Sequence, residues 1–255
     1  MSYSNSSTST TLELEAQYRS LHEISSNYGT SSIRYLPEIR LIIDYLEPKT
    51  VLDFGCGKAS LIKILAKNYP KIEFYGFDPA IPGRDTLPVE KADLIINTDV
   101  LEHIPEDILP DVIKKIASIS NNVYFALHHG LAKTILPNGE NAHCTVKPPQ
   151  WYYDLLSRHF KTPYPLPYQG LDRSALITFS PTVEFLDAYQ KIIFPPPSLE
   201  DISNHINKIE AQLRSFEDAS NKINGIEKKI NVLHWNLRHP LHYFFRKLRS
   251  KILKK

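Results

Sequence analysis

The segment VLDFGCGKA, at residues 51–59, constrains the fold of this chain more than any other. Its short apolar run is typical of a buried β-strand, and it ends at two glycines from which an amphipathic helical pattern starts. Glycine lets the backbone pass close to a ligand that a Cβ atom would block, and a helix start offers unpaired N–H groups. The segment therefore predicts a strand, a ligand-binding turn and a helix.

The chain around this segment alternates strand and helix patterns. Strand patterns lie at residues 50–54, 72–77, 93–97, 123–127 and 175–180, and helical patterns begin near residues 37, 59, 107 and 151. Strands that alternate with helices predict an α/β fold with a mostly parallel sheet. In such folds ligands bind at the carboxyl edge of the sheet.

Two common glycine loops do not fit residues 51–59. The dinucleotide pattern G-x-G-x-x-G fails because Ser60 stands at the third glycine, and no G-K-[ST] follows to make a phosphate loop. The remaining indication of the ligand comes from two carboxylates near the loop. Asp53, two residues before the first glycine, suits a ligand with an ammonium group, and Asp78 at the next strand end can accept both hydroxyls of a ribose. S-adenosylmethionine (SAM) combines these two groups.

Four motifs in order resemble those of the class I SAM-dependent methyltransferases: VLDFGCGKA, FYGFDP, ADLIINTDVLEHI and VYFALHH, within residues 25–160. The resemblance implies a Rossmann-like, doubly wound α/β fold and SAM as cofactor. It places the glycines at the methionine part with Asp53 near its amino group, the acid of FYGFDP at the ribose, Asp85 near the adenine and Asp99 beside the methionine. Ala59 replaces the family's usual third glycine. The implied cofactor-binding residues are Asp53, Gly55, Gly57, Asp78, Pro79, Asp85 and Asp99.

A second set of motifs resembles a subgroup of bacterial and phage methyltransferases, some of which occur with surface-glycan enzymes. The motifs are Asn27-Tyr28-Gly29, DVLEHI at residues 99–104 and LPNGENAH at residues 136–143. This resemblance implies O-methylation of a glycan, a lipid-linked molecule or another small molecule.

A hydroxyl acceptor must lose its proton during methyl transfer, and histidine titrates closest to neutral pH. The candidates are His103, His128, His129 and His143, each of which has the alternative of a structural, hydrogen-bonded histidine. We predict His143 or His129 as the catalytic base. No metal site is predicted, because no ligand cluster stands out in the sequence.

Nucleic acid is the less favoured acceptor. The strand at 93–97 leads into Asn97-Thr98-Asp99-Val100, which is not the N-P-P-[YFW] signature of enzymes that methylate amino groups of DNA bases. Charge points the same way. Nine of the 30 Lys and Arg residues lie in residues 228–255, which leaves 21 basic against 28 acidic residues before them. An acidic body opposes phosphate binding.

Several segments flank the predicted methyltransferase domain, which spans residues 18–194. Residues 1–17 begin with a Ser/Thr/Asn-rich stretch and are predicted to be disordered. Residues 195–198 form a proline hinge, with Ser198 and Asp201 spaced as a helix cap. A heptad pattern at residues 199–237 predicts a coiled coil and a homo-oligomer, and the basic amphipathic tail at 238–255 predicts binding to an anionic membrane surface.

Three features of the sequence bear on the cellular location of the protein. Two cysteines fit a reducing compartment, the first residues lack a secretory signal, and no run of 18 apolar residues occurs. These indicate a cytoplasmic protein, peripheral at the inner face of the membrane. Two alternatives stay open: an RNA methyltransferase that uses the tail as an RNA arm, and a non-catalytic scaffold with a degenerate SAM site.

Overall fold

The computed structural model describes residues 5–238, with side-chain exposure for residues 12–233. It divides into two compact units, Met1–Pro195 and Pro196–Lys255, at a boundary inside the proline run. The predicted basic tail lies outside the described residues except for Arg238.

The first unit is built on a six-stranded sheet of order β2-β1-β3-β4-β6-β5. The strands are β1 Thr50–Phe54, β2 Glu73–Phe77, β3 Leu94–Thr98, β4 Val123–His128, β5 Tyr164–Leu166 and β6 Arg173–Ile177. β1 to β4 pair in parallel, whereas β6 runs antiparallel to both β4 and β5. The motif that resembles the family's fourth-strand motif is β3 of this chain.

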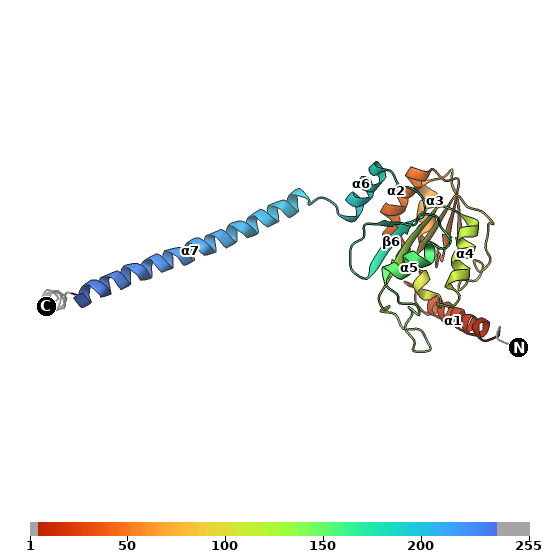
Figure 1. The fold of residues 1–255 in the computed structure, drawn as a ribbon, viewed down its shortest axis with the longest axis horizontal. Helices are drawn as coiled ribbons and strands as arrows, with labels where there is room; N and C mark the ends of the chain where they lie inside the picture. The colour runs from red at the N-terminus through yellow and green to blue at the C-terminus, as the bar shows by residue number, and fades with distance from the viewer. Residues whose placement is uncertain (1–4, 239–255) are drawn as a thin grey trace. The chain divides into compact units, whose positions relative to one another are not determined.

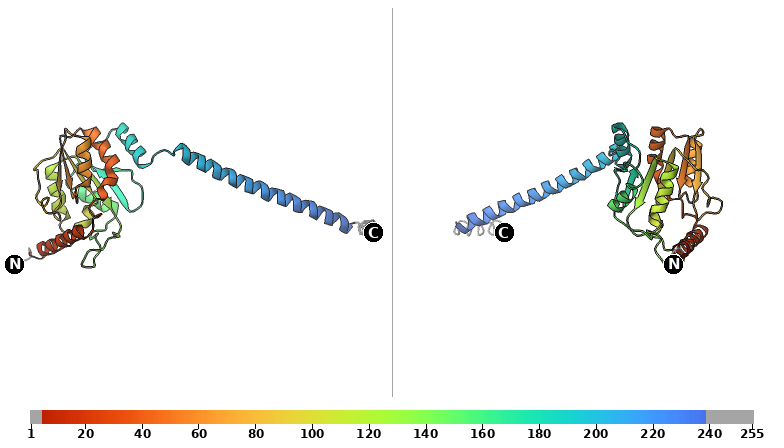
Figure 2. Two further views of the ribbon diagram at one scale, coloured as in Figure 1. Left: turned by 180° about the vertical axis from the view of Figure 1, so that it is seen from behind. Right: turned by 45° about the vertical axis from the view of Figure 1, so that its right-hand side comes forward.

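Helices cover both faces of the sheet (Figures 1 and 2). One face packs on α2 (Leu36–Leu46), α3 (Ser60–Asn68) and α6 (Val183–Ile193), and the other on α4 (Leu109–Ile119) and α5 (Pro149–Leu156). Each face of the sheet has its own hydrophobic core, and successive strand residues point to opposite faces. Val51 packs in the core beneath α2, α3 and α6, and Leu52 packs in the core beneath α4 and α5. These three layers confirm the predicted α/β fold with a mostly parallel sheet.

The N-terminal region differs from its prediction. Residues 5–17 are not disordered but form most of α1, which spans Asn5–Ile24. The Tyr18 hydroxyl on α1 donates to the carbonyl oxygens of Ala142 (2.7 Å) and His103 (3.2 Å). These bonds dock the helix on the loops that follow β3 and β4. The composition of residues 1–17 alone does not indicate such a tertiary contact.

Other boundaries also shift. The sequence pattern gave no element for α6 or for the short β5, and it placed the last strand at 175–180, whereas β6 is Arg173–Ile177. There are also two short 3₁₀ helices among the described residues. η1 (Ser31–Tyr35) precedes α2, and η2 (Leu101–His103) follows β3. Together with α1, they carry residues of the site described below.

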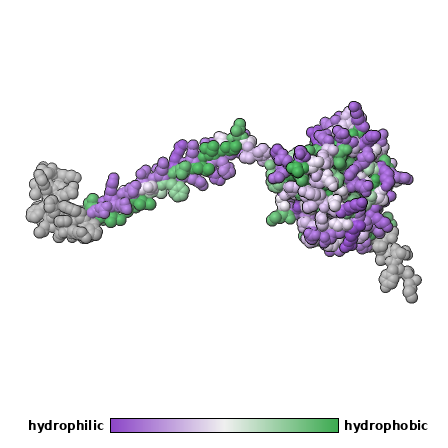
Figure 3. All heavy atoms as spheres, turned by 45° about the horizontal axis from the view of Figure 1, so that its top comes forward, coloured by the Kyte–Doolittle hydropathy of each residue, from purple (hydrophilic) through white to green (hydrophobic). Residues whose placement is uncertain are grey.

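The described part of the second unit, residues 196–238, contains one continuous helix, α7, at Leu199–Arg238. Its start is capped as predicted, because the Ser198 hydroxyl accepts from the Asp201 N–H (3.0 Å) and donates to its carboxylate (2.6 Å). The apolar residues of the heptad pattern are exposed along it (Figure 3). Within residues 5–238, no helix combines the length and apolar character that a bilayer span needs.

Candidate active site

A cavity of about 1050 Å³ opens at the carboxyl edge of the parallel strands. This volume is at the upper end of small-molecule pockets, about 300–1,000 Å³, so it has room for a cofactor and part of an acceptor. Segments that follow β1, β2, β3 and β4 form its wall, together with α1 and η1. Lining residues that matter below are Tyr18, Gly55, Gly57, Asp78, Pro79, Asp99, Glu102, His103, His128, His143 and Arg173.

The glycine loop after β1 takes a backbone course that other residues resist. Gly55 and Gly57 have left-handed φ angles of 89° and 49°. The N–H groups of Gly55 and Cys56 donate to the Phe77 carbonyl at 2.8 and 3.0 Å. A Cβ atom on Gly57 would lie 2.6 Å from the carbonyl oxygen of Gly29, in the Asn27-Tyr28-Gly29 motif. The loop is therefore fixed between β2 and the segment before η1.

Ala59 precedes α3 and stands where the family has a glycine. It also has a left-handed φ angle, 57°, and it is almost fully buried. The position thus keeps the conformation that glycine prefers, at the steric cost of one Cβ atom.

Asp78 presents a firmly held carboxylate to the cavity. Its Oδ2 accepts from the Gly57 N–H at 2.8 Å and its Oδ1 from the Ala80 N–H at 3.0 Å. Each oxygen retains a further lone pair for a ligand. Pro79 lines the cavity beside it, whereas Asp85 is exposed and lies outside the lining. The structure therefore does not bring Asp85 to the place predicted for it.

Asp53 lies at the end of β1 and is 1% exposed. Neither of its carboxylate oxygens has a hydrogen-bond partner among the described residues. Burial raises the pKa of this carboxyl to about 7, and the charge of Asp78 adds to the effect. Asp53 is not part of the lining, so it lies behind the glycine loop as an unsatisfied buried acceptor.

Asp99, directly after β3, is held by a polar network. Its Oδ1 accepts from the Tyr35 hydroxyl at 2.7 Å and from an Arg173 Nη1–H at 2.9 Å. Asp99 itself has a left-handed φ angle of 54°. Sequence reasoning did not include Tyr35 or Arg173 in the site, because only the folded sheet places β6 and η1 beside the end of β3.

The four histidines separate into different environments. The ring of His143 lies between those of His103 and His128, with centroids 4.8 Å from each. All three line the cavity. His129 does not: its Nδ1 is 3.0 Å from the Lys147 carbonyl oxygen and its Nε2 is 2.7 Å from the Ser174 hydroxyl. Of the two bases predicted from sequence, the structure brings only His143 into the cavity.

Burial keeps the imidazoles of His103 and His143 neutral. It lowers the pKa of His103 to about 4, with the neighbouring His143 adding to the effect, and it also lowers the pKa of His143. Nδ1 of His103 is 2.7 Å from the Ala142 carbonyl oxygen, and Nδ1 of His143 is 2.6 Å from that of Gly130. Because a carbonyl only accepts, each Nδ1 carries the hydrogen, which leaves a lone pair on each Nε2.

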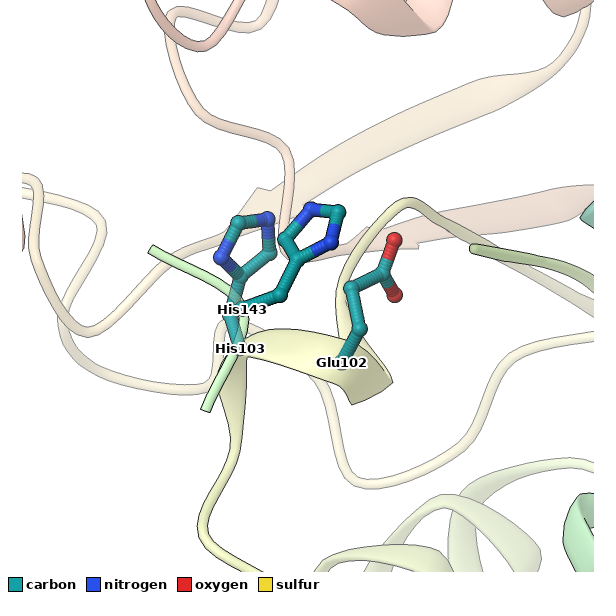
Figure 4. Close-up of side chains that lie close together, drawn as sticks. All are labelled: Glu102, His103 and His143. Atoms are coloured by element: carbon teal, nitrogen blue, oxygen red, sulfur yellow. The ribbon is translucent and has the colours of Figure 1, made fainter. Parts of the chain in front are cut away.

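Glu102 is a further site residue that sequence reasoning did not single out, although it stands inside DVLEHI. Its side chain is fully buried, and no hydrogen bond of normal geometry reaches either carboxylate oxygen among the described residues. Burial raises the pKa of this carboxyl well above its usual range. Glu102 and His103 are adjacent on η2, and Figure 4 shows the ring of His143 between the ring of His103 and the side chain of Glu102.

Residues 33–164, just over half of the chain, match the family model described as a methyltransferase domain. The chain belongs to this methyltransferase family. Its motifs and fold make it a class I SAM-dependent methyltransferase, as the sequence predicted, and SAM is its cofactor. No curated protein sequence is a significant match to this methyltransferase.

Three solved structures with a similar arrangement are distant from this chain in sequence. An O-methyltransferase family protein from Burkholderia thailandensis is 11% identical, with 62% of this chain and 60% of that one covered and a TM-score of 0.45. A SAM-dependent methyltransferase from Archaeoglobus fulgidus is 16% identical, with 56% and 91% covered and a TM-score of 0.41. The N-terminal domain of EvdMO1 with bound SAH is 14% identical, with 56% and 78% covered and a TM-score of 0.41. This methyltransferase spans less than two thirds of the Burkholderia protein.

The residues at the cavity fit SAM. Gly55 and Gly57 line the cavity and Asp78 presents a fixed carboxylate to it, whereas Asp53 lies outside the lining. A cationic, ribose-bearing cofactor satisfies groups of this kind. Of the predicted cofactor-binding residues, those that line the cavity are Gly55, Gly57, Asp78, Pro79 and Asp99, whereas Asp53 and Asp85 lie outside the lining.

Proposed function

We propose that this methyltransferase transfers the methyl group to an oxygen atom of a glycan, a lipid-linked molecule or another small molecule. The observation that supports it is His143, whose Nδ1 is engaged by the Gly130 carbonyl and whose Nε2 lone pair is available in the cavity. An acceptor hydroxyl can donate its hydrogen bond to this nitrogen. The neutral imidazole that burial enforces is the form that accepts a proton.

The other residues of the cavity have separate roles in this proposal. SAM supplies an electrophilic methyl group on a sulfonium. Gly55, Gly57 and Asp78 hold the cofactor in this proposal, and Asp99 is fixed by Arg173 beside it. The protein's main contribution is orientation, because holding the acceptor oxygen against the methyl group removes much of the entropic barrier. α1 helps to close the cavity from water, with Tyr18 in the lining.

Mass spectrometry of glycans and lipids, extracted from cells and treated with the full chain and SAM, tests the acceptor. We expect a gain of one methyl group whose fragments place it on oxygen. Asp78→Asn should reduce SAM binding in calorimetry and abolish the gain. A methyl group found on nitrogen or carbon would refute O-methylation.

We further propose that the basic tail brings the enzyme to the cytoplasmic face of the membrane. The support is charge: residues 228–255 contain nine Lys and Arg and no acid. Each basic residue near anionic lipid contributes about 1 kcal/mol. The full chain should sediment with phosphatidylserine vesicles, and a variant with Arg246, Lys247 and Arg249 changed to Glu should not. Binding to RNA in place of vesicles, steeply reduced by salt, would favour the RNA alternative.

We also propose that α7 joins two or more copies of the chain. Its apolar residues follow the three-and-four spacing of a coiled coil, and they are 42–86% exposed between Leu199 and Leu233. The matching surface for such a stripe is the same stripe on a second copy. The first prediction of the Discussion tests this.

A further inference from the structure

Three side chains with metal-binding atoms meet on one wall of the cavity. Glu102, His103 and His143 each offer one ligand atom, and these atoms all lie within 4.8 Å of one another (Figure 4). Two of them come from η2 and the third from the loop after β4. We propose that they bind a divalent transition-metal cation, which makes this a metal-assisted methyltransferase.

The first argument is the carboxylate of Glu102. It is 0% exposed, and no hydrogen bond of normal geometry reaches either oxygen among the described residues, although the backbone N–H groups of Glu102 and His128 lie close enough to favour its charged form. A buried carboxylate is retained in proteins when it is paired or coordinates a metal. A cation between Glu102 and the two imidazoles supplies what the described protein atoms do not.

The second argument is independent of the first and concerns the imidazole tautomers. His103 and His143 each direct Nδ1 at a backbone carbonyl, at 2.7 Å and 2.6 Å, which leaves Nε2 free to ligate. Metal-bound histidines are held in this way, with the outer ring N–H donated to a carbonyl or carboxylate. The Tyr18 hydroxyl donates to the carbonyl that receives His103, that of Ala142, at 2.7 Å. The hydrogen bonds that would hold the two ligating histidines in position are thus already formed.

The donor set indicates the class of metal. Two imidazole nitrogens and one carboxylate suit Mn²⁺, Fe²⁺, Co²⁺ or Zn²⁺ better than Mg²⁺ or Ca²⁺, which prefer oxygen ligands. Three protein ligands leave coordination positions open, as in catalytic rather than structural sites. The open positions face the cavity that holds the cofactor.

This step rests on the proposed function, because the cation's open position would take the hydroxyl oxygen of the acceptor. Coordination would orient that oxygen and lower the pKa of the hydroxyl, so that its proton passes to water in the cavity while the oxygen takes the methyl group and the cofactor leaves as SAH. The Nε2 lone pair of His143 then binds the metal and cannot also take a proton. The metal site therefore replaces the role of base that the sequence predicted for His143.

The test is a titration of the full chain, stripped by a chelator, with Mn²⁺ followed by electron paramagnetic resonance. We expect one Mn²⁺ per chain. Glu102→Gln should weaken binding by more than about 100-fold, beyond the loss of an outer-shell partner. The matched control is Glu106→Gln, four residues later, whose carboxylate is exposed and paired with Lys147 at 2.6 Å; it should leave the affinity unchanged. No saturable binding by the wild type, or equal binding by Glu102→Gln, would overturn the site.

A second measurement does not depend on whether variants fold. In the wild type with ¹⁵N-labelled histidine, electron spin echo modulation of bound Mn²⁺ should show coupling to imidazole nitrogen, and its absence would overturn the site. Neither experiment includes an acceptor. Failure here therefore leaves O-methylation standing with His143 as base, whereas a methyl group found on nitrogen would refute the proposed function and leave the metal site intact.

Discussion

Two amphipathic helices of this chain, α2 and α7, have similar apolar spacing and opposite surroundings. On α2, Ile39, Ile42 and Ile43 are 0–2% exposed beneath the sheet. On α7, Ile206 and Ile209 are each 51% exposed. A period of three and four residues thus predicts a helix with an apolar face, but it does not say which chain covers that face. The distinction lies in the packing: α2 lies against the sheet of its own unit, whereas the apolar face of α7 is exposed along the described helix.

Placing a charge on each helix should separate the two environments most strongly. Ile42→Asp buries an unpaired carboxylate and should lower the free energy of unfolding by about 5 kcal/mol or more, which leaves the catalytic unit unfolded. Ile209→Asp should change that free energy by less than about 0.5 kcal/mol. It should instead convert oligomers to monomers. Denaturant unfolding and sedimentation velocity measure the two effects.

Both outcomes can fail separately. A monomeric wild type at all concentrations would refute self-association through α7. A fall in the unfolding midpoint of Ile209→Asp comparable to that of Ile42→Asp would show that the apolar face of α7 is covered within its own chain.

Ionisable groups give the next comparison, between Asp53 and Glu210. The folded pKa of Asp53, about 7, lies above its unfolded value of 3.8. Its contribution to stability is therefore fully present below about pH 3.8 and is lost as the pH rises through 7. Asp53→Asn should accordingly stabilise the ligand-free protein by on the order of 4 kcal/mol at pH 8 and by little at pH 4. Thermal unfolding across this pH range measures it.

The matched control is Glu210→Gln on α7. Glu210 forms an exposed pair with Arg214 at 3.8 Å, and such pairs contribute about 0.3–0.5 kcal/mol. Calorimetry with SAM adds a second readout, because Asp53→Asn should weaken cofactor binding while it stabilises the ligand-free protein. A stability difference that does not change with pH would contradict the raised pKa.

The sequence predicted what is local and missed what is tertiary. β1 and the glycine loop were predictable because strand, turn and helix follow one another within residues 50–68. Glu102, His103 and His143 were not recognised as a cluster, because about forty residues separate the third ligand from the other two. Asp85 and His129 were assigned to the site from motif and strand position, but Asp85 is exposed and the imidazole of His129 bonds to Lys147 and Ser174. α1 was missed because its first residues are polar and its docking depends on Tyr18.

The smallest effects concern the caps of α6 and α7, which are chemically similar. The Thr182 hydroxyl accepts from the Phe185 N–H at 3.2 Å, and the Ser198 hydroxyl accepts from the Asp201 N–H at 3.0 Å. Either change to Ala should cost its helix about 1 kcal/mol. Thr182→Ala should lower the global free energy of unfolding by that amount, because α6 packs in the core through Phe185. Ser198→Ala should instead speed hydrogen exchange only in the first turn of α7. An equal loss of global stability in Ser198→Ala would mean that the two units unfold together.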